Sequence, residues 1–172
     1  YLKADPKNHY DEYVSVSPLP WIIGQTYDVA KWCISRMKVN FVEGADSLFE
    51  DLREIGPTFV LFSPRVWEQM AADIRSKIMD ASFLKRFLYK VSMQLMLTKN
   101  KIIKKTLCEY LINRWLRDQL GLSFIKSAAT GGAALGPDTF KFFVDIGIPL
   151  RQLYGQTEQI GAYTIHKEND IN

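Results

Sequence analysis

Residues 127–158, SAATGGAALGPDTFKFFVDIGIPLRQLYGQTE, form the stretch that decides the fold. Two apolar runs in it predict buried strands. A glycine-bearing turn is predicted after each run, at Gly131-Gly132 and at Tyr154-Gly155. Ligands of open α/β sheets bind beyond the carboxyl ends of the strands. Both predicted turns are therefore candidate ligand positions.

A short amphipathic helix is predicted between these turns. Gly136, Pro137 and Asp138 mark its start, because proline suits the first helical position and an acid suits the first turn. Gly147 is its predicted end. The paired glycines before the helix have no side chains, so their backbone can approach a flat or charged ligand.

Composition excludes several classes of protein. A chain of 172 residues with 47% hydrophobic and 24% charged side chains is typical of one soluble globular unit. A formal charge of +3 gives no indication of nucleic-acid binding, and no apolar run is long enough to span a bilayer. Cys33 and Cys108 form no CxxC motif, which favours a reduced, cytoplasmic setting. Two cysteines and two histidines far apart predict no metal cluster. Residues 1–12 are polar and do not resemble a signal peptide.

The rest of the chain alternates strand and helix patterns, which predicts an α/β fold: a layered, mostly parallel sheet of about five strands flanked by helices. The five predicted strands are residues 12–17, 39–42, 58–62, 122–128 and 150–154, of which the last two precede the glycine-bearing turns. The further predicted helices are residues 22–37, 46–55 and 64–79. In the first of these the spacing predicts that the buried side carries Ile22, Val29, Ala30, Cys33 and Met37. Asp46 and Ser63 are the predicted N-caps of the other two.

Residues 82–120 interrupt this alternation with two helical patterns, which predict an inserted helical hairpin. Its outward positions are mostly basic, and the simpler interpretation is a face in water. The sharper one is weak contact with an anionic surface, either the inner face of a membrane or a nucleotide phosphate. The cations are Lys85, Arg86, Lys90, Lys99, Lys101, Lys104, Lys105, Arg114 and Arg117, against Glu109 and Asp118.

The YGQTE motif at residues 154–158, preceded by TGGAA at 130–134, resembles the adenylate-forming superfamily. SPLPW at 17–21, DLREIGPTFVLFSPRVWE at 51–68 and the basic hairpin extend the likeness to the long-chain fatty acyl-CoA synthetase branch. The first loop departs mildly from this family's pattern, since many relatives have SGGAP or SGGAA there.

This resemblance implies roles for individual residues. It places Tyr154 against the adenine of ATP, with Gly131, Gly132 and Ala133 lining the base and Gly155 and Gln156 completing the motif. It assigns Thr157 to donating to the α-phosphate and Glu158 to binding Mg²⁺. Trp21 stands where relatives carry an aromatic residue or histidine beside the acyl pocket. From the residues alone, each position also fits packing, a tight turn or a helix cap.

The implied reaction joins a fatty acid to ATP as acyl-adenylate and then forms the coenzyme A thioester. The phosphate loop expected before this segment, and the ribose motif, hinge and lysine expected after it, are not in residues 1–172. We therefore expect a middle subdomain of a larger N-terminal domain that needs its remainder for activity. Another carboxylate-activating ligase, aryl or short-chain, and a non-catalytic nucleotide-binding or interaction module both stay open.

Overall fold

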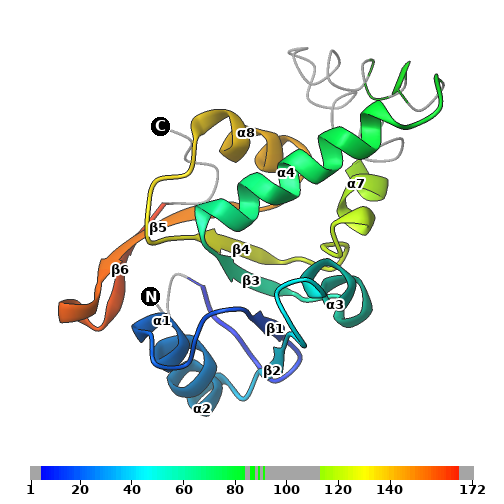
Figure 1. The fold of residues 1–172 in the computed structure, drawn as a ribbon. Helices are drawn as coiled ribbons and strands as arrows, with labels where there is room; N and C mark the ends of the chain where they lie inside the picture. The colour runs from blue at the N-terminus through cyan, green and yellow to red at the C-terminus, as the bar shows by residue number, and fades with distance from the viewer. Residues whose placement is uncertain (1–4, 84–85, 88, 90, 92–112, 167–172) are drawn as a thin grey trace.

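The computed structural model describes residues 5–83, 86, 87, 89, 91 and 113–166, and it is built on a six-stranded sheet (Figure 1). The strand order is β2-β1-β3-β4-β5-β6. The first five strands run parallel, and β6 runs antiparallel to β5. The mostly parallel α/β architecture expected from the sequence is confirmed. The strands are β1 (Glu12–Ser15), β2 (Lys38–Phe41), β3 (Phe59–Phe62), β4 (Ser127–Thr130), β5 (Leu150–Gln156) and β6 (Gly161–Ile165).

Helices cover both faces of the sheet (Figure 1). Four of them, α3 (Leu48–Ile55), α4 (Pro64–Met79), α7 (Arg114–Gln119) and α8 (Pro137–Asp145), lie on one side. A single helical segment lies on the other and consists of α1 (Ile22–Gly24), η1 (Gln25–Lys31) and α2 (Trp32–Ser35). Strand β3 needs helices on both faces of the sheet, because all four of its side chains are buried. Val60 and Phe62 pack under the four helices, and Phe59 and Leu61 pack under the single segment.

The single helical segment differs from the sequence-based expectation in the side that it buries. Residues 25–31 are π-helical, so their side chains do not follow the 3.6-residue period used for the prediction. Tyr27, Asp28 and Lys31 face inward, whereas Val29 is half exposed and Cys33 is exposed. The predicted buried side was wrong for Val29, Ala30 and Cys33 and right for Met37.

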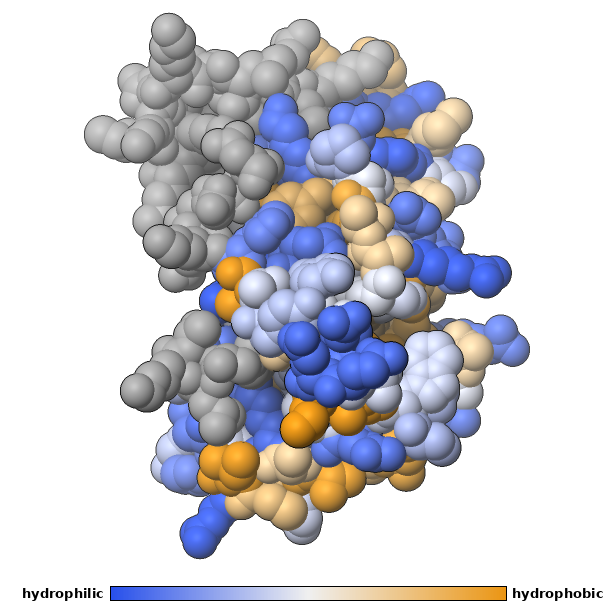
Figure 2. All heavy atoms as spheres, turned by 90° about the vertical axis from the view of Figure 1, so that its left-hand side faces the viewer, coloured by the Kyte–Doolittle hydropathy of each residue, from blue (hydrophilic) through white to orange (hydrophobic). Residues whose placement is uncertain are grey.

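The outward side of this segment is also apolar, and this misled the prediction. Figure 2 shows apolar surface at the lower end of the molecule, where Figure 1 places α1 and α2. A helix that is apolar on both sides gives no clear indication of its buried face. The exposed apolar side chains there are Leu19, Trp21, Val29, Trp32 and Ile34.

Three further expectations are corrected at the ends of elements. Helix α3 starts at Leu48 with Ser47 as its N-cap, one residue after the predicted Asp46. Strand β4 begins at Ser127, because Gly121 has φ +69° and the chain turns before it reaches the sheet. The third correction concerns Tyr154 and Gly155, which lie inside β5 and not in a turn. The strand continues to Gln156 and pairs with β6, which was not predicted.

The helical hairpin predicted for residues 82–120 lies mostly outside the described residues, and so does Cys108. Of its predicted basic side chains, the structure describes those of Arg86, Arg114 and Arg117. Among the described parts of the chain, no helix combines the length and apolar character needed to cross a membrane. The contact of this hairpin with an anionic surface stays a prediction.

Candidate functional site

The turn after β4 forms the first wall of the candidate site. Strand β4 ends at Thr130, and Gly131 and Gly132 then lead the chain away from the sheet. Gly132 has φ +87°, a backbone conformation that side chains other than glycine's rarely allow. A β-carbon on Gly132 would meet no heavy atom within 4 Å, so this residue faces open space. The turn therefore presents bare backbone at the carboxyl edge of the sheet.

A pocket of about 450 Å³, here called the apolar pocket, opens on one side of this turn. Its size is within the range of small-molecule sites. Its apolar residues come from strands β3, β5 and β6 and from the chain between Pro20 and Tyr27. The lining comprises Pro20, Trp21, Ile22, Ile23, Thr26, Tyr27, Leu61, Gly131, Gly132, Leu153, Gly155, Gln156, Thr157, Gly161 and Ala162.

A second pocket of about 620 Å³, here called the loop pocket, borders the same turn. The loop before α8, the helix itself and the end of β5 form its walls. Its lining comprises Gly132, Ala133, Ala134, Leu135, Pro137, Phe140, Gln152, Leu153, Tyr154, Gly155 and His166.

The two pockets adjoin. Gly132, Leu153 and Gly155 line both of them, so the turn after β4 and the end of β5 together separate one pocket from the other. Two of these three residues are glycines. A ligand could therefore extend from one pocket into the other past backbone that carries no side chain.

Most of the residues predicted for the site come together around these pockets. Trp21, Gln156 and Thr157 line the apolar pocket, and Ala133 and Tyr154 line the loop pocket. Tyr154 is 61% exposed and contacts Tyr163 edge to face, with ring centroids 5.4 Å apart. Its outer face is thus open to a planar partner. Gly131 lines the apolar pocket, and Gly132 and Gly155 line both pockets.

Glu158 is the predicted residue that lines neither pocket. It is exposed in η3 (Thr157–Gln159), the short 3₁₀ turn that connects β5 to β6. The described residues include no group of three or more His, Cys, Asp or Glu side chains that could hold a metal. Any Mg²⁺ here would take one carboxylate from the protein and the rest of its ligands from phosphate and water, which is a common arrangement for this ion.

Sequence reasoning missed several lining residues. Tyr27 was missed because a helix with 3.6-residue spacing would place it off the buried face. His166 and Ala162 were missed because β6 was not predicted. Gln152 lies in a predicted strand, but nothing in its local sequence shows that its side chain reaches the turn after β4.

A buried carboxylate, that of Asp28, follows the apolar-pocket residue Tyr27 in η1. Asp28 is 6% exposed, and its Oδ2 accepts a hydrogen bond of 2.7 Å from the Ser15 hydroxyl. Burial raises the pKa of Asp28 above its ordinary value, while the hydrogen bond from Ser15 partly opposes this. Burial next to Asp28 also raises the pKa of the Tyr13 hydroxyl. Burial therefore disfavours the ionised form of each group relative to the same group in water.

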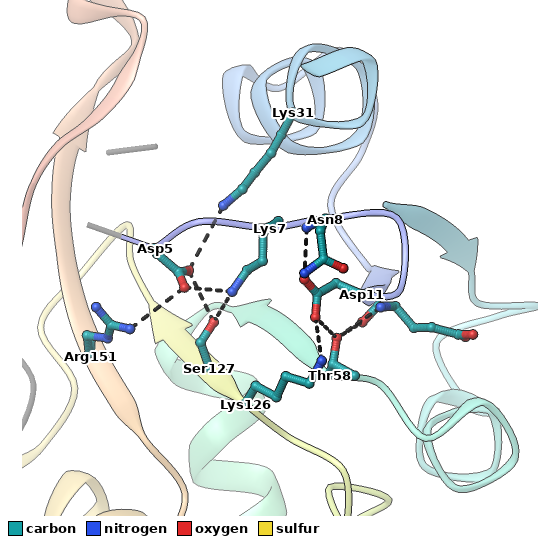
Figure 3. Close-up of polar contacts among 10 residues, drawn as sticks. Asp5, Lys7, Asn8, Asp11, Lys31, Thr58, Lys126, Ser127 and Arg151 are labelled. Atoms are coloured by element: carbon teal, nitrogen blue, oxygen red, sulfur yellow. Dashed lines mark hydrogen bonds and ion pairs between the residues drawn. The ribbon is translucent and has the colours of Figure 1, made fainter. Parts of the chain in front are cut away.

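A separate polar network lies at the opposite, amino end of the strands (Figure 3). Asp5 contacts Lys7 at 2.6 Å, Ser127 at 3.1 Å, Arg151 at 3.7 Å and Lys31 at 4.0 Å. Burial favours protonation of Asp5, but the neighbouring cations and hydrogen bonds lower its pKa. Burial lowers the pKa of Lys31 to about 8. This network holds the N-terminal segment on the sheet, and none of these five residues lines either pocket.

The comparisons with known proteins agree with this geometry. The family model described as AMP-binding enzyme matches residues 2–172. The long-chain-fatty-acid–CoA ligase ACSBG2 of Rattus norvegicus is 30% identical over 169 residues, which are 90% of this chain and 25% of that protein. The chain thus spans about a quarter of the length of the curated relatives that it matches.

Two solved structures show the same fold. One is the adenylation domain of the carboxylate reductase of Mycobacterium chelonae, with TM-score 0.67 and 19% identity over 91% of this chain and 22% of that one. The other is the A domain of carboxylic acid reductase from Segniliparus rugosus, in complex with AMP and a co-purified carboxylic acid. It has TM-score 0.65 and 22% identity over 90% of this chain and 22% of that one.

Proposed function

Because the chain belongs to the AMP-binding enzyme family, we propose that its two adjoining pockets hold the two halves of an acyl-adenylate. The nucleotide occupies the loop pocket, and the acyl chain occupies the apolar pocket. The protein would activate a long-chain fatty acid with ATP and transfer the acyl group to coenzyme A. The observation that carries the proposal is the sharing of Gly132, Leu153 and Gly155 by the two pockets.

The loop pocket suits an adenine base. The exposed ring of Tyr154 offers one flat surface, and the backbone of Gly132 and Ala133 offers the other wall. Stacking of a base on an aromatic side chain contributes about 1–3 kcal/mol in other proteins. Phe140 and His166 close the pocket in edge-to-face contact, with ring centroids 6.2 Å apart.

The apolar pocket suits a hydrocarbon chain. Leu61 and Leu153 line it from the sheet, and Ile23 and Tyr27 line it from the helical segment. Trp21 also lines it and is 63% exposed. Burying a CH₂ group contributes about 0.8 kcal/mol, so an acyl chain here would add substantially to the affinity of the nucleotide. The curated relative named above is called a long-chain-fatty-acid–CoA ligase, which supports this class of substrate.

Adenylation joins a fatty-acid carboxylate oxygen to the α-phosphorus of ATP and breaks the bond to pyrophosphate. Attack by the thiol of coenzyme A on the acyl carbonyl then gives the thioester and AMP. The family resemblance assigns the Thr157 hydroxyl to the α-phosphate, to which it would donate a hydrogen bond, and Thr157 lines the apolar pocket two residues after the shared Gly155. Glu158 would hold Mg²⁺, which supplies positive charge to the phosphates when bound.

Calorimetric titration of the 172-residue chain with AMP and with GMP tests the nucleotide half of this proposal. AMP should bind saturably and much more tightly than GMP, since the loop pocket is assigned to adenine. Tyr154→Ala should weaken AMP binding about tenfold, a loss in the range expected for stacking. Tyr10→Ala is the matched control, because Tyr10 is 74% exposed and lines neither pocket. Equal affinity for the two nucleotides would refute the assignment.

A further inference from the structure

The backbone pairing of β4 with β5 stops at the point where the candidate site begins. Its last paired residues are Thr130 and Gln152. Beyond Thr130 the chain turns away at Gly131 and Gly132, so the following backbone groups lie outside the sheet. Because backbone amides and carbonyls need partners, the loop before α8 must find them elsewhere.

The side chain of Gln152 supplies those partners. Its Nε2 donates to the carbonyl oxygen of Ala133 at 2.9 Å, and its Oε1 accepts from the amide of Leu135 at 3.3 Å. Nε2 also donates to the carbonyl oxygen of Leu153 at 3.3 Å. A side-chain amide has one donating and one accepting end, like a peptide group. Gln152 thus continues the sheet pairing with its side chain where the backbone pairing has ended.

The backbone of Gln152 is fixed as well. The carbonyl oxygen of Gln152 accepts a hydrogen bond of 3.1 Å from the amide of His166, and Gln152 pairs with Thr130 in the sheet. The side chain therefore projects from a fixed backbone position. Ala133 and Leu135, which it holds, both line the loop pocket.

We propose that Gln152 is a positioning residue that sets the shape of the loop pocket by holding Ala133 and Leu135 at a fixed distance from β5. The part of this inference that concerns nucleotide affinity rests on the proposed function. The hydrogen bonds themselves do not depend on that function, so the two can be tested separately. Gln152 acts through the loop and need not touch the ligand.

Two substitutions distinguish the hydrogen bonds from the volume of the side chain. Gln152→Met keeps a similar length and removes all three side-chain hydrogen bonds, including the two to the loop at Ala133 and Leu135. Gln152→Glu keeps an acceptor for the Leu135 amide but, when ionised, places a second acceptor against the carbonyl oxygen of Ala133. Protonation of this carboxyl restores a donor, so the effect of Gln152→Glu on ligand affinity should depend on pH. Gln69→Met is the matched control, because Gln69 is exposed on α4 away from both pockets.

Hydrogen exchange on the ligand-free chain tests the hydrogen bonds directly. The Leu135 amide should exchange much faster in Gln152→Met and keep its protection in Gln152→Glu and Gln69→Met. The Phe140 amide, which donates to Gly136 at 2.9 Å in the first turn of α8, serves as the internal reference. Unchanged protection of Leu135 in Gln152→Met, or an equal loss at Phe140, would overturn the inference.

Ligand titration tests the consequence for the site. Gln152→Met should weaken AMP binding about tenfold, as expected for the loss of two hydrogen bonds that order the loop. At pH 7.5, Gln152→Glu should bind the uncharged probe adenosine more weakly than the wild type does. This difference in affinity should become smaller at pH 4.5. A deficit independent of pH, or full AMP affinity in Gln152→Met, would overturn the positioning role. A wild-type chain that binds no AMP would refute the proposed function and leave the exchange result to decide on the hydrogen bonds.

Discussion

Gly155 of β5 lies directly against Gly161 of β6, and a β-carbon on Gly155 would collide with the carbonyl oxygen of Gly161. The pairing of these strands shifts register between Tyr154 and Gly155, next to this contact. Glycine is therefore required here by the neighbouring strand and not only by a ligand. The same residue lines both pockets, so the packing of β6 fixes a wall of the site.

Gly155→Ala should accordingly separate β5 from β6 and weaken AMP binding. Overpacking of this kind typically costs about 1–3 kcal/mol of stability. Urea unfolding and AMP titration measure the two effects. Gly44→Ala is the matched control, because a β-carbon on Gly44 meets nothing within 4 Å. Wild-type stability and affinity in Gly155→Ala would contradict the described contact.

Asp28→Asn should change the pH dependence of stability. Burial raises the folded-state pKa of Asp28 above 3.8, so the unfolded chain releases its proton first as the pH rises. The wild type therefore loses stability from about pH 4 up to the folded-state pKa, whereas Asp28→Asn keeps an acceptor for Ser15 and has no such loss.

Thermal unfolding between pH 4 and pH 7 checks this expectation. The stability of Asp28→Asn relative to the wild type should increase with pH across this range. Asp46→Asn, at an exposed position before α3, should show no such trend. A relative stability that falls with pH would mean that the ionised form of Asp28 is favoured by folding.

Glu158→Gln should reduce the effect of Mg²⁺ on ATP binding. The substitution keeps the shape of the side chain and removes the charge that a hard cation prefers. The ratio of ATP affinities with and without Mg²⁺ should fall toward one, while AMP affinity without metal stays unchanged. Titration calorimetry measures both, and Glu54→Gln on the exposed side of α3 is the matched control. An unchanged ratio would show that Glu158 does not bind the metal.

Trp21→Ala should weaken binding of an acyl-adenosine analogue without changing AMP affinity. Trp21 lines the apolar pocket and is absent from the loop pocket, so only the acyl half of a ligand should respond. Trp32→Ala is the control, because Trp32 is 51% exposed in α2 and lines neither pocket. Fluorescence titration with palmitoyl sulfamoyl adenosine and with AMP measures the two affinities of the wild type and of both variants. Equal effects on both ligands would place Trp21 outside the acyl site.

The local sequence pattern was sufficient to predict those features that depend only on the residues of one helix or strand. The run FVLF predicted β3, since four apolar residues in succession fit a strand buried on both faces. Ser63 and Pro64 predicted the start of α4, and Gly136 and Pro137 predicted the start of α8. The two glycine segments were correctly expected near one edge of the sheet.

Contacts between distant segments could not be predicted in the same way. Tyr154-Gly155 reads as a turn in isolation, but pairing with β6 makes it part of a strand. The inward side of residues 25–31 depends on π-helical geometry, and the spacing of apolar residues does not reveal that geometry. The reach of Gln152 to Ala133 depends on where β4 and β5 lie side by side.

Competition between ligands tests the central claim, that two adjoining pockets hold one acyl-adenylate. The wild-type chain is titrated with AMP, with palmitate and with palmitoyl sulfamoyl adenosine, each alone and in the presence of the others. We predict that AMP and palmitate bind together, that the joined analogue displaces both, and that it binds about 100-fold or more tightly than AMP. An analogue that displaces only one of the two ligands, or that binds no more tightly than AMP, would contradict the account.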